Sequence, residues 1–217
     1  MKKYDGIYNR RVKPMIDFPI ALILIISLLP VILIISASIL ISSGRPVFYI
    51  AERCGYHGRI FKIYKFRTMI RDADQLGSGT SALHDKRVTK IGKILRKTKL
   101  DEMPQLFNIL KGEMSFVGPR PELIRYTSRY SPEETVILEV RPGITDYSSL
   151  EFISLDILVG EQNADEVYEN DILPAKNRLR MKYAETVSIQ TDCKLLFITF
   201  IKVVHRIFCY IIHKSSS

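Results

Sequence analysis

The chain has 217 residues, a formal net charge of +9, 47% hydrophobic residues and a mean hydropathy of +0.06. This composition excludes a disordered chain, because apolar and aromatic residues are abundant, and a polytopic membrane protein, because 25% of the residues are charged. The length allows one domain with an appendage but is short for two full cores. The charge is divided into +3 over residues 1–44, +9 over 45–125, −9 over 126–171 and +6 over 172–217.

A run of 24 uncharged residues, 18–41, dominates the N-terminal part of the chain. In a helix this run is long enough to cross a hydrocarbon layer of ~30 Å. Pro30 lies near its middle, where it removes one backbone hydrogen bond, and Ser27 can bond to a freed carbonyl and help to hold a bend. The residues that follow offer no convincing cleavage site, which disfavours a signal peptide.

Basic side chains flank this run at both ends. Those before it are Lys2, Lys3, Arg10, Arg11 and Lys13, and those after it are Arg45, Arg53, Arg59, Lys62, Lys65 and Arg67. Positive flanks are retained on the cytoplasmic side of a membrane, so a helix that enters, bends at Ser27 and Pro30 and returns satisfies both of them. A straight span leaves one flank outside. The sequence therefore favours a re-entrant helix, with a spanning helix as the alternative.

Short elements are expected over the middle of the chain. Aromatic and β-branched residues over 46–69 predict two short strands around a turn, and apolar spacing predicts helices over 88–97 and 101–111. Pro104 fits the first turn of the second helix and Gly112 its end. The remaining expectations are a loop at 72–85, a rigid loop at 114–122, helices at 122–130 and 133–140, a turn at 141–146, an acidic stretch at 146–171 and a basic helix at 174–185.

The last apolar stretch, 195–212, differs from the first because basic residues interrupt it. These residues gather largely on one side: Lys194, Lys202, Arg206 and His213. The pattern predicts an amphipathic helix in the headgroup layer, with a core-packing helix as the alternative. The predicted fold is α+β and mainly helical, with a re-entrant membrane helix, a small strand element and amphipathic interfacial helices. Its expected parts are 1–44, a catalytic core at 45–146, and 147–217.

Two adjacent carboxylates, Asp101 and Glu102, stand at an expected helix start after ten basic residues between positions 62 and 97. The helix dipole and the basic surroundings favour the ionised carboxylates, which can bind Mg²⁺ beside a phosphate. An ionised aspartate can also attack phosphorus and carry the phosphoryl group as a reactive acyl phosphate. Taken alone the pair is a weak signal, because most such pairs are solvated helix starts.

Four motifs in order strengthen this interpretation: KFRTM at 65–69, RVTKIGKILRKTKLDEMPQLFN at 87–108, MSFVGPRPE at 114–122 and RPGIT at 141–145. Behind a membrane helix broken by Ser and Pro, they resemble the bacterial sugar transferases, the small monotopic phosphoglycosyl transferases. The resemblance implies an enzyme that transfers a sugar-1-phosphate from a UDP-sugar to polyprenol (undecaprenyl) phosphate, releases UMP and starts a glycan. It also implies a re-entrant helix with both ends on the cytoplasmic face of the bacterial inner membrane.

The resemblance further implies roles for single residues. Asp101 would be the nucleophile that forms an aspartyl-phosphosugar intermediate, and Asp101 with Glu102 would hold Mg²⁺. The phosphate-binding positions would be Lys65, Arg67, Arg96, Arg120 and Arg141. From the residues alone, Arg96 and Arg120 could instead be structural, and Lys65 and Arg67 could bind anionic lipid.

After RPGIT the chain departs from the commoner family pattern. It reads DYSSLEF where many relatives continue with Gly-Trp-Ala-Gln, and it has no tryptophan. The donor sugar and the role of the acidic stretch therefore stay open. The alternative functions are a non-catalytic membrane scaffold or an anionic-ligand-binding protein, and no nucleic-acid motif accompanies the pI of 9.4. The expected partners are the UDP-sugar, the polyprenol phosphate and an anionic bilayer, with a homodimer or downstream glycosyltransferases as further candidates.

Overall fold

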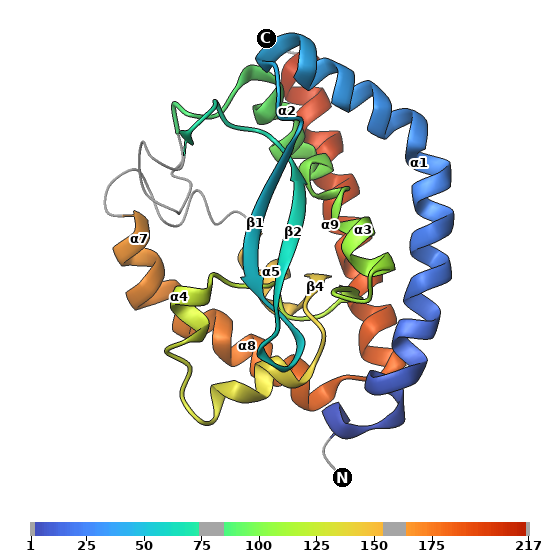
Figure 1. Cartoon of the computed structure of the whole chain (residues 1–217), viewed down its shortest axis with the longest axis vertical. Helices are drawn as coiled ribbons and strands as arrows, with labels where there is room; N and C mark the ends of the chain where they lie inside the picture. Colours follow the sequence, from blue (N-terminus) through green and yellow to red (C-terminus); the bar gives the residue numbers. More distant parts are fainter. Residues whose placement is uncertain (1–2, 74–84, 154–163, 216–217) are drawn as a thin grey trace.

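Figure 1 shows the chain as a computed structural model, which describes residues 3–73, 85–153 and 164–215. The mainly helical α+β fold with a long apolar N-terminal helix is confirmed. The helices and strands are α1 Lys13–Ser43, β1 Phe48–Cys54, β2 Ile60–Phe66, α2 Lys90–Thr98, α3 Gln105–Leu110, β3 Ser115–Val117, α4 Ile124–Thr127, β4 Gly143–Thr145, α5 Tyr147–Glu151, α7 Ala164–Val167, α8 Leu173–Thr186 and α9 Ile189–Ser215. The loop expected at 72–85 lies almost entirely outside the described residues, as does the middle of the acidic stretch.

Helix α1 contains the apolar run and follows a π-helical turn at Tyr8–Val12. Among the described residues, Tyr8–Ser43 is the helix that is long and apolar enough to cross a membrane, by length and composition. Only 11% of its most apolar window is buried, unlike the core helix of a soluble protein. Pro19 and Pro30 lie inside α1, and Figure 1 shows that the helix bends sharply, with its second half crossing the top of the molecule.

The two strands predicted at 46–69 are confirmed as an antiparallel hairpin. In β1 and β2, Phe48 lies opposite Phe66 and Cys54 opposite Ile60. Ile63 belongs to a buried apolar cluster with residues of α3 and of the first half of α1. Phe66 belongs to another, with residues of α2 and of the second half of α1. The hairpin therefore packs against both halves of the bent helix, because apolar burial favours these contacts.

A second sheet occupies the segments where a rigid loop and a turn were expected. β3 and β4 pair in parallel, with Ser115 opposite Gly143 and Val117 opposite Thr145. The turn expected at 141–146 is therefore wrong, and the loop at 114–122 is wrong in its first part. Strands of three residues are too short to show a period-2 pattern, and their pairing depends on a contact between distant segments.

Glycine is required where these two strands meet. A Cβ added at Gly143 would lie 2.1 Å from the backbone nitrogen of Gly118, and one added at Gly118 would lie 2.2 Å from the carbonyl oxygen of Arg141. The sequence suggests ordinary turn glycines here. The structure instead gives them a different role, because they let two backbones approach more closely than any side chain would permit.

Helix α2 confirms the helix expected at 88–97. Its N-cap is Thr89, whose hydroxyl oxygen accepts a hydrogen bond from the Gly92 nitrogen at 2.9 Å. The helix expected at 101–111 is shorter than predicted. A 3-10 turn, Leu100–Glu102, comes first, and α3 begins only at Gln105. Asp101 and Glu102 thus lie in a tight turn between two helices rather than in the first turn of one.

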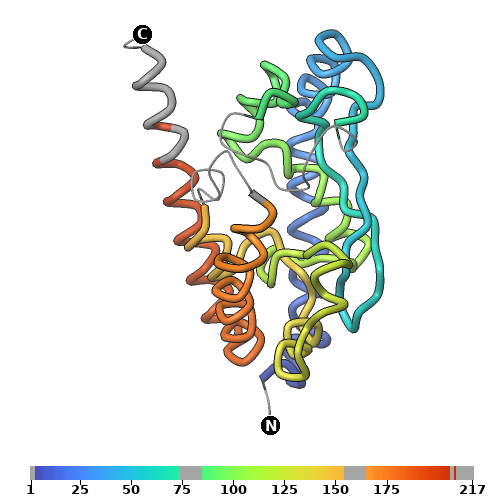
Figure 2. Tube along the Cα trace, turned by 90° about the vertical axis from the view of Figure 1, so that its left-hand side faces the viewer, coloured from blue at the N-terminus to red at the C-terminus, as the bar shows by residue number. Residues whose placement is uncertain are grey.

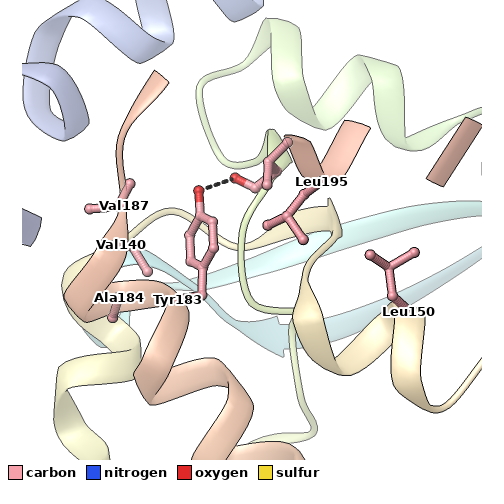
Figure 3. Close-up of a cluster of buried hydrophobic side chains, with 7 residues drawn as sticks. Val140, Leu150, Tyr183, Ala184, Val187 and Leu195 are labelled. Carbon is pink, nitrogen blue, oxygen red and sulfur yellow. Dashed lines mark hydrogen bonds between the residues drawn. The ribbon is translucent and has the colours of Figure 1, made fainter. Parts of the chain in front are cut away.

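The helices expected at 122–130 and 133–140 are also reduced. The first is the four-residue α4, and the second is a 3-10 helix, Glu134–Glu139. The basic helix expected at 174–185 is confirmed as α8. Its Tyr183 is fully buried and donates a hydrogen bond to the Val117 carbonyl at 3.0 Å, inside the cluster that Figure 3 shows.

Helix α9 lies along the outside of the molecule in Figure 2. Leu195 is buried on its inner side, where Lys202 Nζ also donates to the Leu150 carbonyl at 2.9 Å. The exposed apolar residues of α9 are Ile189, Leu196, Phe197, Phe200, Ile201, Val204 and Phe208. One face of α9 therefore packs against the core, as the core-packing alternative expects, and the other presents apolar side chains outward. Its placement in the headgroup layer stays a prediction.

A buried polar cluster fixes the start of α1 to the C-terminal helices. The carboxylate of Asp192 accepts hydrogen bonds from the hydroxyls of Tyr8 at 2.6 Å and Tyr183 at 2.7 Å, and it pairs with Lys13. Lys13 and Asp192 are 3% and 5% exposed, so solvent screens this pair weakly. The start of the long apolar helix α1 is therefore held in a defined position relative to α8 and α9.

Candidate active site

Asp101 and Glu102 lie in the turn that joins α2 to α3. Helix α2 ends at Thr98, and the next residue, Lys99, has a left-handed backbone with φ of 61° that terminates the helix. Both carboxylates are buried, with exposed fractions of 8% and 9%. Burying two adjacent acids is costly unless cations compensate, so their partners decide what the site can do.

Glu102 is held by cations from two other elements. Arg120 donates to both of its carboxylate oxygens, one of them at 2.8 Å, and Lys65 Nζ lies 3.6 Å from Oε1. Lys65 comes from β2, and Arg120 from the loop after β3, where Pro119 and Pro121 restrict its backbone. The structure thus brings together four of the predicted residues: Asp101, Glu102, Lys65 and Arg120.

The two carboxylates respond differently to this setting. Burial opposes ionisation of Glu102, but Arg120 and Lys65 outweigh burial and hold the pKa of Glu102 below its usual range. Burial and the neighbouring charge of Glu102 raise the pKa of Asp101, although Lys65 opposes them. The expectation that the surroundings favour both ionised carboxylates therefore applies to Glu102 and fails for Asp101, because burial and the charge of Glu102 outweigh the cations at Asp101.

Lys65 is also perturbed. Burial and the repulsion of Arg120 lower the pKa of Lys65 to about 8, although both carboxylates oppose this change. A lysine with that pKa is partly neutral at the pH of a cell, and a bound phosphate would restore its charge. The residue is therefore suited to respond to an incoming anion.

Gln105, four residues after Asp101, is a candidate site residue that sequence reasoning missed. It is the first residue of α3 and is fully buried, and neither its amide nitrogen nor its amide oxygen has a hydrogen-bond partner. Oδ1 of Asp101 is buried and unpartnered as well. Asn108, one helical turn later, donates to the Lys62 carbonyl and to Glu113 and accepts from the Tyr64 nitrogen. Only its fully buried position distinguishes Gln105, and the sequence does not show burial.

The other predicted phosphate ligands have partners elsewhere. Arg67 donates to the carbonyls of Ser43 and Gly44 at the end of α1. Arg96 Nε donates to the Thr68 hydroxyl at 2.9 Å. Arg141 donates to the carbonyls of Gly112 and Asn9 and stacks over the ring of Tyr56, 4.8 Å from its centroid. These contacts anchor elements to one another and do not join Asp101 and Glu102.

A second buried network fixes the loop that carries Arg120. Glu122 accepts hydrogen bonds from Arg180 at 2.6 Å and from the Tyr168 hydroxyl. Burial opposes the ionised form of Glu122, but Arg180 and Lys176 overcome burial and hold the pKa of Glu122 at about 2. Because Glu122 lies two residues after Arg120, the C-terminal helices determine where this guanidinium stands.

The carboxylates fit a Mg²⁺ ion that shares its other coordination positions with phosphate oxygens and water. Oδ1 of Asp101 is unpartnered and available, whereas Arg120 contacts both oxygens of Glu102. Within the described residues, no group of three or more His, Cys, Asp or Glu side chains forms a metal site. Binding of Mg²⁺ at these two carboxylates would therefore need oxygens from the substrate, as is usual for Mg²⁺ at phosphate-transferring sites.

Comparison with known proteins agrees with this arrangement. The sequence model of the family described as bacterial sugar transferase matches residues 8–206. The chain is 43% identical over 122 residues to a putative undecaprenyl-phosphate N-acetylgalactosaminyl 1-phosphate transferase of Bacillus subtilis (strain 168), covering 56% of this chain and 68% of the relative. It is 32% identical over 198 residues to the UDP-glucose:undecaprenyl-phosphate glucose-1-phosphate transferase of Escherichia coli (strain K12), covering 89% of this chain and 40% of that longer relative. The chain therefore belongs to the bacterial sugar transferase family.

Proposed function

We propose that this chain is a membrane-attached phosphoglycosyl transferase that moves a sugar-1-phosphate from a UDP-sugar to polyprenol (undecaprenyl) phosphate and releases UMP. The names of both relatives above specify undecaprenyl phosphate, and that of the E. coli relative specifies UDP-glucose. The observation that carries the proposal is Asp101, a buried aspartate with an unpartnered carboxylate oxygen. It adjoins a Glu102–Arg120 pair and Lys65, a cationic setting suited to a diphosphate.

In the first step, a carboxylate oxygen of Asp101 attacks the phosphorus that carries the sugar. A bond forms between this oxygen and phosphorus, and the bond from phosphorus to the bridging oxygen of the diphosphate breaks. UMP leaves with that oxygen and its electron pair. The product on the protein is an aspartyl-phosphosugar, a mixed anhydride that is reactive enough to pass its group on.

In the second step, a phosphate oxygen of the polyprenol phosphate attacks the same phosphorus. The bond between phosphorus and Asp101 breaks and returns the carboxylate. The product is a polyprenyl-diphospho-sugar, and no net proton transfer is needed in either step. One nucleophile thus serves two substrates in sequence, which suits a site built around a single unpartnered aspartate.

The cations of the site neutralise the charge of the substrate. A planar guanidinium suits phosphate oxygens, so Arg120 is placed to exchange contact with Glu102 for contact with the diphosphate. Lys65 adds positive charge beside it and gains protonation when the anion binds. A Mg²⁺ ion held by Asp101 and Glu102 would offset the charge that develops on the leaving phosphate. Arg67, Arg96 and Arg141 act around this centre rather than in it.

The same proposal includes a re-entrant path for α1 and attachment at the cytoplasmic face of the bacterial inner membrane. The bend in α1 and the basic flanks at both of its ends support this path. In Figure 1, α9 runs in the direction of the line that joins the two ends of α1. If both ends lie at the membrane surface, α9 then lies along that surface with its apolar residues toward the lipid.

Radioactive donor tests the covalent step. Purified protein incubated with UDP-sugar labelled in the sugar-bearing phosphate, with Mg²⁺ and without acceptor, is expected to become labelled and to release one equivalent of UMP. Polyprenol phosphate is then expected to remove the label. Asp101→Asn is expected to lose labelling by about 10³-fold or more, because an amide is not a nucleophile at this site.

Two variants decide whether Asp101 is the nucleophile. Glu113→Gln, which changes an acid in the turn after α3 that contacts Asn108 and neither Asp101 nor Glu102, is expected to label at the wild-type rate. Equal labelling of Asp101→Asn would reject the nucleophile assignment. Release of UMP only when acceptor is present, with no labelled protein, would replace the covalent route by direct transfer. The donor is found by comparing UMP release across a panel of UDP-sugars.

A further inference from the structure

Arg67 lies at the point where the membrane helix ends. Its side chain is 7% exposed, and its Nη2 donates to the carbonyls of Ser43 and Gly44, both at 2.7 Å. These carbonyls belong to the C-terminal end of α1, so the guanidinium also offsets the negative end of the helix dipole. If α1 is re-entrant, this end of the helix is at the membrane surface.

The remaining donors of Arg67 are unused. Neither Nε nor Nη1 has a hydrogen-bond partner, although both are buried. A buried guanidinium with two idle donors is costly, because it has lost its contacts with water. Among the described residues, the contacts of the Arg67 guanidinium are with these two carbonyls and not with a carboxylate. Burial and the nearby Arg71 lower the pKa of Arg67. Among the described residues, the site therefore has excess positive charge.

Two further arginines make the surroundings more basic. Arg45 and Arg71 are exposed at the same end of α1, where Arg71 donates to the Arg45 carbonyl at 3.1 Å. Both are exposed whereas Arg67 is buried, and Arg71 is close enough to act on the charge of Arg67. An anion that approaches along the membrane surface would meet them first.

Arg67 is aligned with the active site. The Arg67 nitrogen donates to the Val47 carbonyl at 2.9 Å, so the pairing of β1 with β2 continues to this residue. Side chains two apart in a strand point to the same face, about 7 Å from each other. Lys65, which contacts Glu102, is therefore the neighbour of Arg67 on that face. The hairpin carries one row of cations from the end of α1 to Asp101 and Glu102.

We infer that Arg67, with Arg45 and Arg71, forms a binding site for a lipid-borne phosphate group at the end of α1, and that this site passes the acceptor's phosphate along the hairpin to Asp101. The acceptor role rests on the proposed function. Loading of Asp101 by the soluble donor does not need this site, whereas discharge to a membrane-bound phosphate does. Arg67 must rotate toward the surface to use its idle donors, and the loss of one carbonyl contact would accompany that movement.

Separate measurement of the two half-reactions tests this inference. Full-length Arg67→Gln and Arg67→Lys are loaded with labelled donor and then mixed with increasing polyprenol phosphate in neutral nanodiscs. We expect the acceptor concentration for half-maximal discharge to rise at least tenfold in both variants. The rate of loading is expected to fall by a much smaller factor. Arg129→Gln, which removes an exposed arginine that is 72% accessible, is the control expected to match the wild type.

Vesicle flotation distinguishes the sources of the phosphate. It compares vesicles of phosphatidylcholine alone with vesicles that also contain phosphatidylglycerol. A rise in the acceptor requirement assigns the site to the acceptor's phosphate, and loss of the preference for phosphatidylglycerol alone assigns it to phospholipid headgroups. Either result supports a site for lipid-borne phosphate, and wild-type behaviour of both variants in both assays would overturn it.

Two controls separate this inference from other failures. Arg67→Lys keeps a cation that can reach the α1 carbonyls, so it carries the test if Arg67→Gln does not fold. If wild-type protein is not loaded by any donor, the proposed function fails, and the flotation assay still tests the site.

Discussion

Asp101 and Glu102 are neighbours with opposite electrostatic conditions. Arg120 and Lys65 hold Glu102 ionised, and Glu102 in turn makes ionisation of Asp101 less favourable. An aspartate whose pKa is raised keeps a more basic, and hence more nucleophilic, carboxylate when it is ionised. The buried carboxylate of Asp101 thus lowers the stability of the folded protein and raises the reactivity of the site, a combination common in active sites.

Asp101→Asn is therefore expected to stabilise the protein. Because the folded-state pKa of Asp101 is above its unfolded value, the ionised carboxylate costs stability at pH values above the folded-state pKa, and the cost vanishes as pH falls through the unfolded value. The gain at pH 7.5 is expected to be about 0.5–2 kcal/mol, in the range typical of relieved active-site strain. Thermal unfolding measured from pH 7.5 down to pH 4 is expected to show the two proteins converging. A less stable variant at pH 7.5 would mean that Lys65, Lys99 and Arg120 outweigh Glu102 at Asp101.

At the scale of elements, the parallel pairing of β3 with β4 brings the Pro-Arg-Pro motif at 119–121 next to the Arg-Pro-Gly motif at 141–143. Gly143→Ala would place a methyl group on the backbone of Gly118, and neither backbone can move without breaking the parallel pairing. We expect a loss of about 3 kcal/mol, at the upper end for overpacking. Gly112→Ala is the matched control, because Gly112 has φ of 73° but open space around its Cα, so only backbone strain of about 1–2 kcal/mol applies. Urea unfolding measures the free energy of unfolding of both variants. If Gly143→Ala and Gly112→Ala lose the same amount, close approach of the two backbones is not the reason for a glycine at 143.

How far the sequence predicts each element depends on the range of the interactions that form it. The hairpin and α2 follow from local patterns, because strand residues flank a glycine turn and Thr89 caps a helix. β3 and β4 do not, because each is three residues long and becomes a strand only through its distant partner. The same distinction holds for the site. Asp101 and Glu102 are visible as a motif. The burial that raises the pKa of Asp101, the contacts of Arg120 and Lys65 that lower the pKa of Glu102, and the burial of Gln105 all arise from packing.

At the scale of the molecule, two apolar surfaces and the active site have a consistent arrangement. Helix α1 is almost wholly exposed along its most apolar part, and α9 presents Phe197, Phe200 and Phe208, which are 66%, 67% and 63% exposed. Exposed apolar surfaces of this extent indicate contact with a membrane or another protein. In the proposed arrangement α1 dips into the bilayer and α9 lies along its surface. β2 would then carry Lys65 and Arg67 from the membrane toward Asp101, so the lipid acceptor would not need to leave the headgroup layer.

The absence of tryptophan allows a direct test of this orientation. Phe200→Trp places one fluorophore on the exposed face of α9, and Glu133→Trp places one at an exposed position before the Glu134–Glu139 helix. In nanodiscs with brominated acyl chains, the Phe200→Trp protein is expected to emit at shorter wavelength and lose at least half of its emission, because bromine quenches only on contact. The Glu133→Trp protein is expected to keep its emission. If both proteins behave alike, α9 is not against lipid, and cross-linking through the native exposed Cys193 would then show whether a second copy of the chain covers that face.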